Sequence, residues 1–224
     1  MKRIMIALVV LCLLVPFGMD SFFLEAASAA NPADLPIVAS KEEFLNAAVS
    51  DMKISIPKGA VIDRTEVTIE YFGKTAVNGT SIPKPKGVTP QWGQIAYYYI
   101  SNKTGPSEAW GTTRIATTSG GPGPGTLTLG QTVTVSNSFS ANVGVTAGVV
   151  SAGLGFNVTV STQWSCSYAA QIPSGQHATI NAYPVYDCYS YDVWYNPKIG
   201  DAYKAGNGSA KQSVGVAYVV SYWH

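Results

Sequence analysis

The strongest constraint in this chain is a stretch of 72 residues, residues 115–186, without a single Lys, Arg, Asp or Glu. Within it, apolar and polar side chains alternate through residues 133–149. Successive side chains of an extended backbone point to opposite sides, so an alternation with period two indicates a strand. Solvent-facing strands commonly carry Lys and Glu, but here the polar face consists of Ser, Thr, Asn and Gly. The sequence therefore predicts amphipathic strands with an uncharged polar face.

The N-terminus has the three parts of an export signal. Lys2 and Arg3 supply positive charge, residues 4–17 form an apolar run, and residues 27–29 read Ala-Ser-Ala, which is a typical cleavage site. The apolar run is too short for a transmembrane helix. We therefore predict a signal peptide at residues 1–29 and a mature protein that is secreted into the extracellular space.

The rest of the chain has the pattern of a mainly β protein. A capping box, with Ser40 as the N-cap and Glu43 at the third helical position, predicts one short N-terminal helix at residues 41–50. The Gly- and Pro-rich residues 120–125 interrupt the chain. We expect an elongated antiparallel β-sheet or sandwich. Its two parts are an N-terminal β-rich region at residues 30–125 and a C-terminal β-rich region at residues 126–224.

Two amphipathic strands of the C-terminal region fit one hairpin, at residues 133–168. A two-residue turn at residues 151–152 would place Phe139 opposite Trp164. The apolar side chains of both strands then share one side of the hairpin. A slip by one residue would destroy that match, so the pattern specifies the register of the pairing.

The mature chain has two cysteines, Cys166 and Cys188. Export makes a disulfide between them plausible. A tight turn at residues 173–176, however, would set Cys166 opposite Tyr183, and the remaining offset corresponds to about 16 Å of strand. That separation is far beyond bridging distance. The bonded and the free state both stay open at the level of the sequence.

Motifs for catalysis or metal binding are missing from the sequence. The two histidines, His177 and His224, lack the spacing of a zinc site. A thiol of Cys166 or Cys188 with His177 would supply a nucleophile and a base, but a lone histidine on a polar segment is far more often a surface residue. A formal net charge of +1 argues against nucleic acid as a partner. We expect no catalytic residue, no cofactor, no metal and no enzyme activity.

The neutral amphipathic hairpin meets the requirements for membrane insertion at about residues 136–165. Strands can cross a bilayer only as a closed barrel, which pairs every backbone polar group, so several subunits would each contribute one hairpin. A crossing strand needs about 9–11 residues, an apolar lipid face, and a polar face that need not be charged. The apolar face of the predicted membrane-inserting hairpin comprises Phe139, Val143, Val145, Val149, Val150, Leu154, Phe156, Val158 and Val160.

The same part of the chain carries a family resemblance. Three segments resemble the membrane-spanning module of aerolysin-type β-pore-forming toxins: residues 136–144, which begin Ser-Asn-Ser-Phe-Ser, residues 155–161, and Ile-Pro-Ser-Gly at residues 172–175. The resemblance covers roughly residues 126–195. It implies secretion as a soluble monomer, binding through a separate region, assembly of a homo-oligomeric ring, and release of the hairpin. The partners that it implies are target membrane lipid or a cell-surface receptor.

A soluble β-sandwich also explains the alternation, because one face of each sheet then lies in the core. In that case the protein is a secreted non-catalytic binding protein or is associated with the cell envelope. The chain has 13 Tyr and 5 Trp, and exposed aromatic rings suit carbohydrate. The pore-forming interpretation is favoured because it explains the charge-free stretch. The aromatic residues that would contact a glycan or another ligand are Tyr183, Tyr186, Tyr189, Tyr191 and Trp194.

Overall fold

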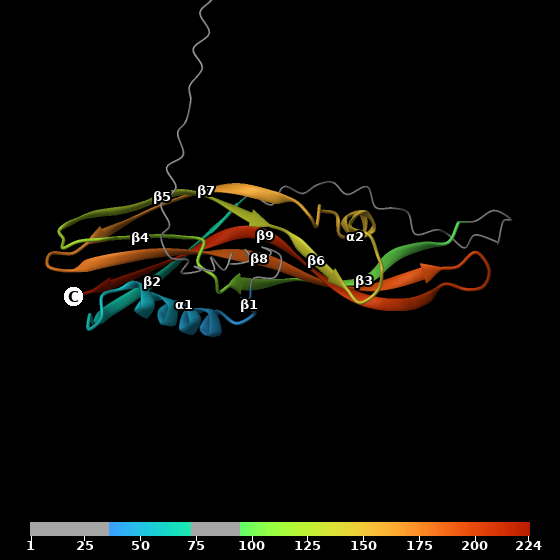
Figure 1. Ribbon diagram of the computed structural model, residues 1–224, viewed down its shortest axis with the longest axis horizontal. Helices are drawn as coiled ribbons and strands as arrows, with labels where there is room; N and C mark the ends of the chain where they lie inside the picture. The colour runs from blue at the N-terminus through green and yellow to red at the C-terminus, as the bar shows by residue number, and fades with distance from the viewer. Residues whose placement is uncertain (1–35, 73–94) are drawn as a thin grey trace, which may run out of the picture.

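A computed structural model describes residues 36–72 and 95–224 of the chain. The predicted signal peptide, residues 1–29, lies outside these ranges. Within them the chain forms two helices and nine strands, and the molecule is elongated (Figure 1). The helices are α1 (Lys41–Ser55) and α2 (Ala147–Leu154). The strands are β1 (Ile37–Val38), β2 (Ile62–Tyr71), β3 (Tyr97–Gly111), β4 (Ala116–Gly120), β5 (Gly125–Ser136), β6 (Ser138–Ala141), β7 (Ser161–Ile172), β8 (His177–Asn196) and β9 (Tyr203–Trp223).

Seven strands form the main sheet, in the order β1-β3-β8-β9-β2, with β4 paired to β8 and β6 paired to β9. Every pair is antiparallel, which confirms the predicted fold class. The centre of the sheet is the hairpin β8–β9, whose strands have 20 and 21 residues. Because β3 pairs with β8, the two regions predicted on either side of residues 120–125 build one sheet together.

Helix α1 begins where the capping box predicted. The Ser40 side chain accepts a hydrogen bond from the Glu43 amide at 3.3 Å. The helix ends at Ser55 rather than at residue 50. It continues because Met52 lies two turns after Phe44 on the same buried face, which extends the apolar stripe.

A two-stranded sheet of β5 and β7, which we call the ribbon, forms a second layer on the main sheet. The ribbon lies on one face of the sheet and α1 on the other (Figure 1). Alternate side chains of β9 face opposite sides of the sheet. Tyr218 and Val220 pack beneath the ribbon, whereas Ala217 and Val219 pack against α1. This part of the molecule is therefore sandwich-like, with β8 and β9 buried from both faces.

Candidate membrane-inserting segment

The ribbon is paired with itself and, among the described residues, with no other strand. Twelve consecutive pairs join β5 to β7, from Gly125 opposite Ile172 to Ser136 opposite Ser161. Side chains, and not a backbone ladder, therefore attach the ribbon to the main sheet. The ribbon can separate from that sheet without breaking a β-ladder.

The two faces of the ribbon have opposite character. On the inner face, Leu129 and Cys166 are fully buried above the main sheet. Tyr168 stacks on Tyr218 with ring centroids 4.8 Å apart. The outer face has no charge and exposes hydroxyl and amide groups to solvent. These outer residues include Thr126, Thr128, Thr132, Thr134, Gln163, Ser165, Ser167 and Gln171.

Aromatic rings and hydroxyl groups make the directional contacts of the inner face. The Trp164 ring stacks on Phe72, with centroids 3.7 Å apart. Its Nε1 donates a hydrogen bond to Ser213 Oγ at 3.2 Å. The Tyr168 and Thr68 hydroxyls lie 3.1 Å apart. Because the ribbon carries no charge, none of these contacts is an ion pair.

Between β5 and β7 the chain makes an excursion over residues 137–160, which we call the strap. Its first part, β6, lies along the edge of the main sheet and pairs with β9 over four residues. Its second part, α2, lies across the face of the sheet that carries Tyr191 and Val193. The strap thus wraps around the free edge of β9 and returns to the ribbon.

Close contacts hold α2 on β3. A Cβ at Gly153 would collide with the Ile100 side chain, so glycine lets α2 lie this close to β3. Lys103 Nζ donates a hydrogen bond to the Leu154 carbonyl at 3.3 Å, where a positive charge suits the C-terminus of a helix. Gly155 then ends the helix in the left-handed conformation, with φ of 86°.

Most of the predicted membrane-facing residues pack against the sheet in this state. The period-two pattern identified their buried face correctly, because odd-numbered residues of 139–149 are partly buried and even-numbered ones are exposed. Val149 is half-buried outside the cluster, and Val160 is 40% exposed. The strap residues in the apolar cluster between the strap and the sheet are Phe139, Val143, Val145, Val150, Leu154, Phe156 and Val158.

The predicted hairpin at residues 133–168 is wrong in register and in extent. Val133, and not Phe139, lies opposite Trp164, so the pairing differs from the prediction by six residues. The two strands pair over residues 125–136 and 161–172, and the strand pairing ends where the strap begins. The even shift keeps each side chain on the predicted face of its strand.

The predicted turn at residues 151–152 lies inside α2. The reason is that Val150 and Leu154 are four residues apart, a spacing that places both on one face of a helix. Both are buried there. The intervening Ala and Ser also tolerate a helix. The apolar pattern of this short segment therefore fits a helix as well as a strand, and packing on Ile100 decides between them.

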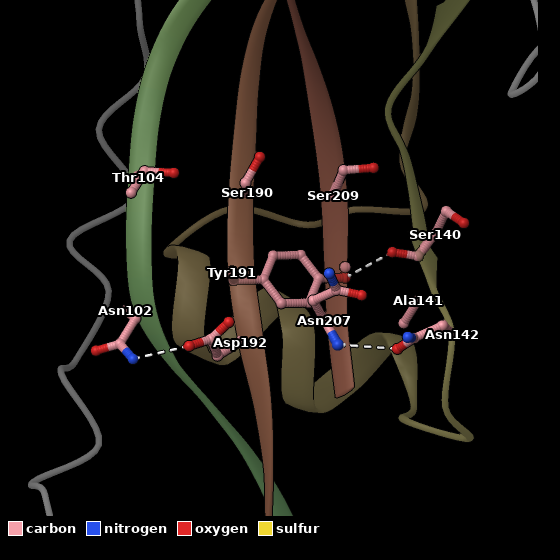
Figure 2. A pocket seen from close by; sticks show the side chains of 11 residues that line it. Asn102, Thr104, Ser140, Ala141, Asn142, Ser190, Tyr191, Asp192, Asn207 and Ser209 are labelled. Atoms are coloured by element: carbon pink, nitrogen blue, oxygen red, sulfur yellow. Dashed lines mark hydrogen bonds between the residues drawn. The ribbon is translucent and has the colours of Figure 1, made fainter. Parts of the chain in front are cut away.

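Three of the five aromatic residues predicted to contact a glycan are buried, so that prediction is wrong for Tyr183, Tyr186 and Tyr191. The Tyr191 hydroxyl donates a hydrogen bond to the Ser140 carbonyl at 3.2 Å (Figure 2). Burial raises the pKa of Tyr191 and the pKa of Tyr186 to about 12. The prediction failed because β8 is a central strand, with α1 packed over Tyr183 and the strap packed over Tyr191.

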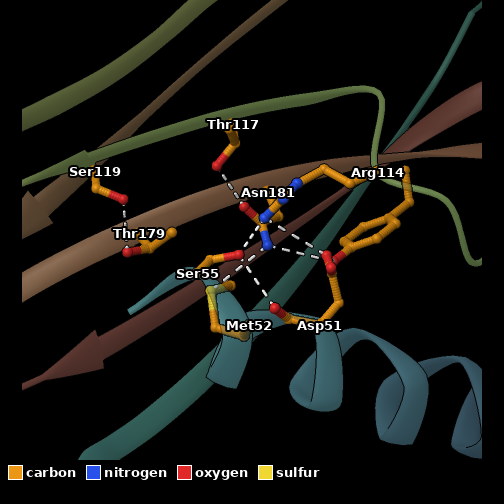
Figure 3. A network of polar contacts seen from close by, with 9 residues as sticks. Asp51, Met52, Ser55, Arg114, Thr117, Ser119, Thr179 and Asn181 are labelled. Carbon is orange, nitrogen blue, oxygen red and sulfur yellow. Dashed lines mark hydrogen bonds and ion pairs between the residues drawn. The ribbon is translucent and has the colours of Figure 1, made fainter. Parts of the chain in front are cut away.

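Asp51 of α1 and Asn181 of β8 belong to one polar network (Figure 3), and this network also includes Tyr183. The Tyr183 hydroxyl donates to Asp51 Oδ2 at 2.7 Å and accepts from Asn181 Nδ2 at 3.3 Å. Arg114 Nη1 lies 3.7 Å from Asp51 Oδ2, and Thr117 donates to Asn181 Oδ1 at 2.7 Å. Burial, followed by the hydrogen bond to Asp51, raises the pKa of Tyr183, so the hydroxyl stays protonated. The network fixes α1 and the β3–β4 connection to the sheet.

Tyr189 and Trp194 are the predicted aromatic residues that stay partly accessible. The Tyr189 ring packs 5.3 Å from the Phe156 ring of the strap. The Trp194 ring stacks on Tyr99, with centroids 6.4 Å apart. Trp194 therefore remains a candidate contact for a ligand, whereas Tyr189 contributes to docking of the strap.

The two cysteines are free thiols. Cys166 faces inward from the ribbon, whereas Cys188 lies in the main sheet opposite Lys211. The disulfide considered from the sequence is not formed, because the two residues belong to different sheets and their strands do not pair. Burial raises the pKa of both thiols, which disfavours the reactive thiolate. The ring of His177, the histidine considered as a base, stacks on the ring of Trp223, with centroids 4.4 Å apart.

Within the described ranges, no group of three or more His, Cys, Asp or Glu residues could hold a metal ion. No helix in those ranges is long and apolar enough to span a bilayer.

No protein-family model and no curated protein matches this sequence. Among solved structures, the chain is similar to that of parasporin-2, a Bacillus thuringiensis toxin described as recognising cancer cells. The identity is 12%, the alignment covers 58% of this chain and 70% of that chain, and the TM-score is 0.24. A likeness of this size is too low to support a shared function, so we base the function on the geometry of the ribbon and the strap.

Proposed function

We propose that this protein is a secreted pore-forming protein that oligomerises on a target membrane and inserts an amphipathic β-hairpin of about residues 136–165. The observation that carries the proposal is that the ladder of the ribbon already continues into the strap. The Asn137 amide donates a hydrogen bond to the Val160 carbonyl at 2.9 Å. This bond lies one pair beyond Ser136 and Ser161, the last pair of the ribbon.

Continued in the same register, this ladder would convert the whole strap into a hairpin. Phe139 would then face Val158, and Val143 would face Leu154. The apolar side chains of both strands would lie on one face, with Ser, Thr, Asn and Gly on the other. Gly-Val at residues 148–149 would form the turn, with glycine at the first central position as a type II′ turn requires.

The strands of this hairpin would have the length and the composition of membrane-crossing strands. Residues 137–147 and 150–160 would form them, 11 residues each, which agrees with the roughly 9–11 residues that a tilted strand needs. Neither strand contains a charge, and a Lys or Arg at the bilayer midplane would cost about 2–4 kcal/mol. The neutral outer face of the ribbon would continue directly into the polar lumen face.

Release of the strap has a cost that the membrane can offset. The four-residue pairing of β6 with β9 and the apolar contacts with Tyr191 and Val193 would be lost. New backbone hydrogen bonds along the hairpin would replace the lost β6–β9 pairing, because backbone polar groups must be paired within the protein in hydrocarbon. The apolar side chains of the strap would move from one apolar environment into another, so the strap itself loses little hydrophobic free energy.

This mechanism implies several copies and a membrane partner. One hairpin cannot close a barrel, so a homo-oligomer on the membrane is required. The partner is target membrane lipid or a cell-surface receptor, and the export signal at residues 1–29 would deliver the protein to the extracellular space. The proposed activity is not catalytic and needs no cofactor.

Dye release from liposomes of total cell-membrane lipid tests the proposal. Val145→Asp places a charge on the proposed lipid face. Gly144→Asp is the matched control, because it places the same charge one residue away on the lumen face, where an added Cβ meets no atom within 4 Å. We expect Val145→Asp to abolish release and Gly144→Asp to retain it, with both variants folded by circular dichroism.

Two outcomes would contradict the proposal. Equal leakage from Val145→Asp and Gly144→Asp would show that this hairpin is not the spanning element. A parent protein that neither releases dye nor forms an oligomer on the vesicles would not be a pore-forming protein for that lipid.

A further inference from the structure

Four strands of the main sheet form an open polar groove (Figure 2). It has a volume of about 520 Å³ and is lined by residues of β3, β8, β9 and β6. Figure 2 shows α2 behind these strands, so the groove lies on the opposite face of the sheet. Its side chains alternate along β8 with Tyr191 and Val193, which pack under the strap.

A row of hydroxyl groups crosses the groove. Thr104, Ser190, Ser209 and Ser140 are successive partners on the four neighbouring strands. In the part of the chain that the structure describes, the side-chain hydroxyls of this row make no hydrogen bond with another residue. Each hydroxyl can both donate and accept, so the row offers unused hydrogen-bonding groups to a ligand.

A second row carries amides and one paired carboxylate. Asp192 lies opposite Asn207, whose backbone N–H donates a hydrogen bond to Asn142 Oδ1 at 2.8 Å. Lys204 Nζ lies 2.6 Å from one Asp192 oxygen, and Asn102 donates to the other at 2.8 Å. Lys204, and then Asn102, hold the pKa of Asp192 below its usual value. The carboxylate therefore stays ionised beside its cation, and the row has no net charge.

Aromatic rings form the next row along the same face. Tyr99 and Trp194 are partners on β3 and β8, two residues from the polar row. Their rings are stacked at 6.4 Å with an interplanar angle of 21°. The Tyr97 ring lies 6.1 Å from Tyr99 and is 38% exposed. A flat apolar wall therefore borders a floor of hydroxyls and amides.

We propose that this groove binds a short neutral oligosaccharide. A sugar ring has an apolar face of C–H groups, which suits an aromatic wall, and a rim of hydroxyls that donate and accept hydrogen bonds. A neutral sugar fits because Lys204 already pairs with the one carboxylate. Four strands at about 4.8 Å spacing span roughly 14 Å, which gives room for about two sugar rings.

The groove also spans the boundary between the strap and the rest of the molecule. Ser140 and Asn142 belong to the strap, whereas Ser190 and Asn207 belong to β8 and β9. A sugar that contacts both sides binds only while the strap is docked. It must therefore stabilise docking by the factor 1 + [sugar]/Kd, so free sugar should slow dye release. This consequence rests on the proposed pore-forming function, but the binding itself does not.

A glycan array with neutral and acidic oligosaccharides, probed with the mature chain, tests the ligand class. Calorimetry with the best neutral glycan then gives the affinity. Ser190→Leu fills the floor of the groove, and Thr128→Leu is the matched control on the exposed outer face of the ribbon. We expect Ser190→Leu and Trp194→Ala each to weaken binding about tenfold or more. Thr128→Leu should leave the affinity unchanged, and Trp194→Phe, which keeps a flat ring, should restore most of it.

The site is refuted if no neutral glycan binds at millimolar concentration, or if Ser190→Leu and Trp194→Ala both bind as tightly as the parent. Binding that requires an acidic sugar would refute the neutral ligand. The two proposals can fail separately. Glycan binding by a protein that never releases dye would support the sugar-binding groove and contradict the pore-forming function. Sugar-independent leakage that Val145→Asp abolishes, without glycan binding, would do the reverse.

Discussion

The two long hairpins of this molecule, β8–β9 and the ribbon β5–β7, share antiparallel pairing and buried apolar faces but are held in different ways. β8 has β3 and β4 as neighbours, and β9 has β2 and β6, so β8–β9 is paired along both outer edges. In the described ranges, the ribbon has no such neighbours. The two hairpins therefore differ in backbone pairing rather than in hydrophobicity, because the ribbon is attached to the main sheet through side chains.

The two hairpins also differ in charge. β8 and β9 carry Asp187, Asp192, Lys204 and Lys211, whereas the ribbon and the strap carry no charge at all. Charges on a lipid-facing strand cost a few kcal/mol each near the midplane. The neutral hairpin is therefore the one that combines a separable backbone with a composition suited to lipid.

The largest expected effect comes from a disulfide that ties the strap to β9. Ser140 and Ser209 lie directly opposite each other in β6–β9, and such Cα atoms are about 4.5–5.5 Å apart, within the range of a disulfide. We expect Ser140→Cys/Ser209→Cys, with Cys166 and Cys188 replaced by Ala, to release no dye when oxidised and to regain release with reductant. The single variant Ser140→Cys is the control. Leakage from the oxidised, cross-linked protein would show that the strap need not leave.

The next effect separates global from local stability. Ile180 of β8 is fully buried, and Ile180→Ala should lower the free energy of unfolding by about 2–5 kcal/mol. Leu154 belongs to α2 and is buried where the strap packs on the sheet, so Leu154→Ala should mainly favour opening of the strap. Urea denaturation measures the first, and hydrogen exchange of α2 amides measures the second. An equal fall of the urea midpoint in both variants would show that the strap unfolds together with the core.

A smaller effect is expected from the two glycines of α2. Gly153→Ala would collide with Ile100 and lift α2 from β3, whereas a Cβ at Gly148 meets no atom within 4 Å. Gly148→Ala should therefore stabilise the helix by about 0.5–1 kcal/mol through propensity alone. We expect faster amide exchange in α2 for Gly153→Ala and slower exchange for Gly148→Ala. The same direction of change in both would contradict the packing of α2 on Ile100.

The smallest effect concerns the ammonium group at the end of α2. Lys103→Met keeps an unbranched side chain but removes the donor to the Leu154 carbonyl. An exposed charge at a helix C-terminus contributes about 0.3–1 kcal/mol, so opening of the strap should rise severalfold at most. Hydrogen exchange at low ionic strength measures it, with Lys58→Met as a control. Since salt screens such contacts, the effect should shrink in high salt, and an effect that persists there would point to a cause other than charge.

The sequence by itself determined the features that depend on local patterns. The capping box at Ser40 placed the start of α1, because the cap is a contact between residues three apart. Alternation identified Ser140 of β6 as exposed between the partly buried Phe139 and Ala141, because an extended backbone sends neighbours to opposite faces. The absence of charge from residues 115–186 covers the ribbon and the strap, together with β4 and the first half of β8.

Only the tertiary structure decided which partner each face meets. The register of the ribbon, with Val133 opposite Trp164, depends on packing against β2 and β9, which are distant in sequence. Helix α2 replaced a strand because Ile100 of β3 accepts it closely, and Tyr183 and Tyr191 of β8 are buried because α1 and the strap pack over them. A period of two reports that a face is buried but not what buries it, since the covering residues come from distant parts of the chain.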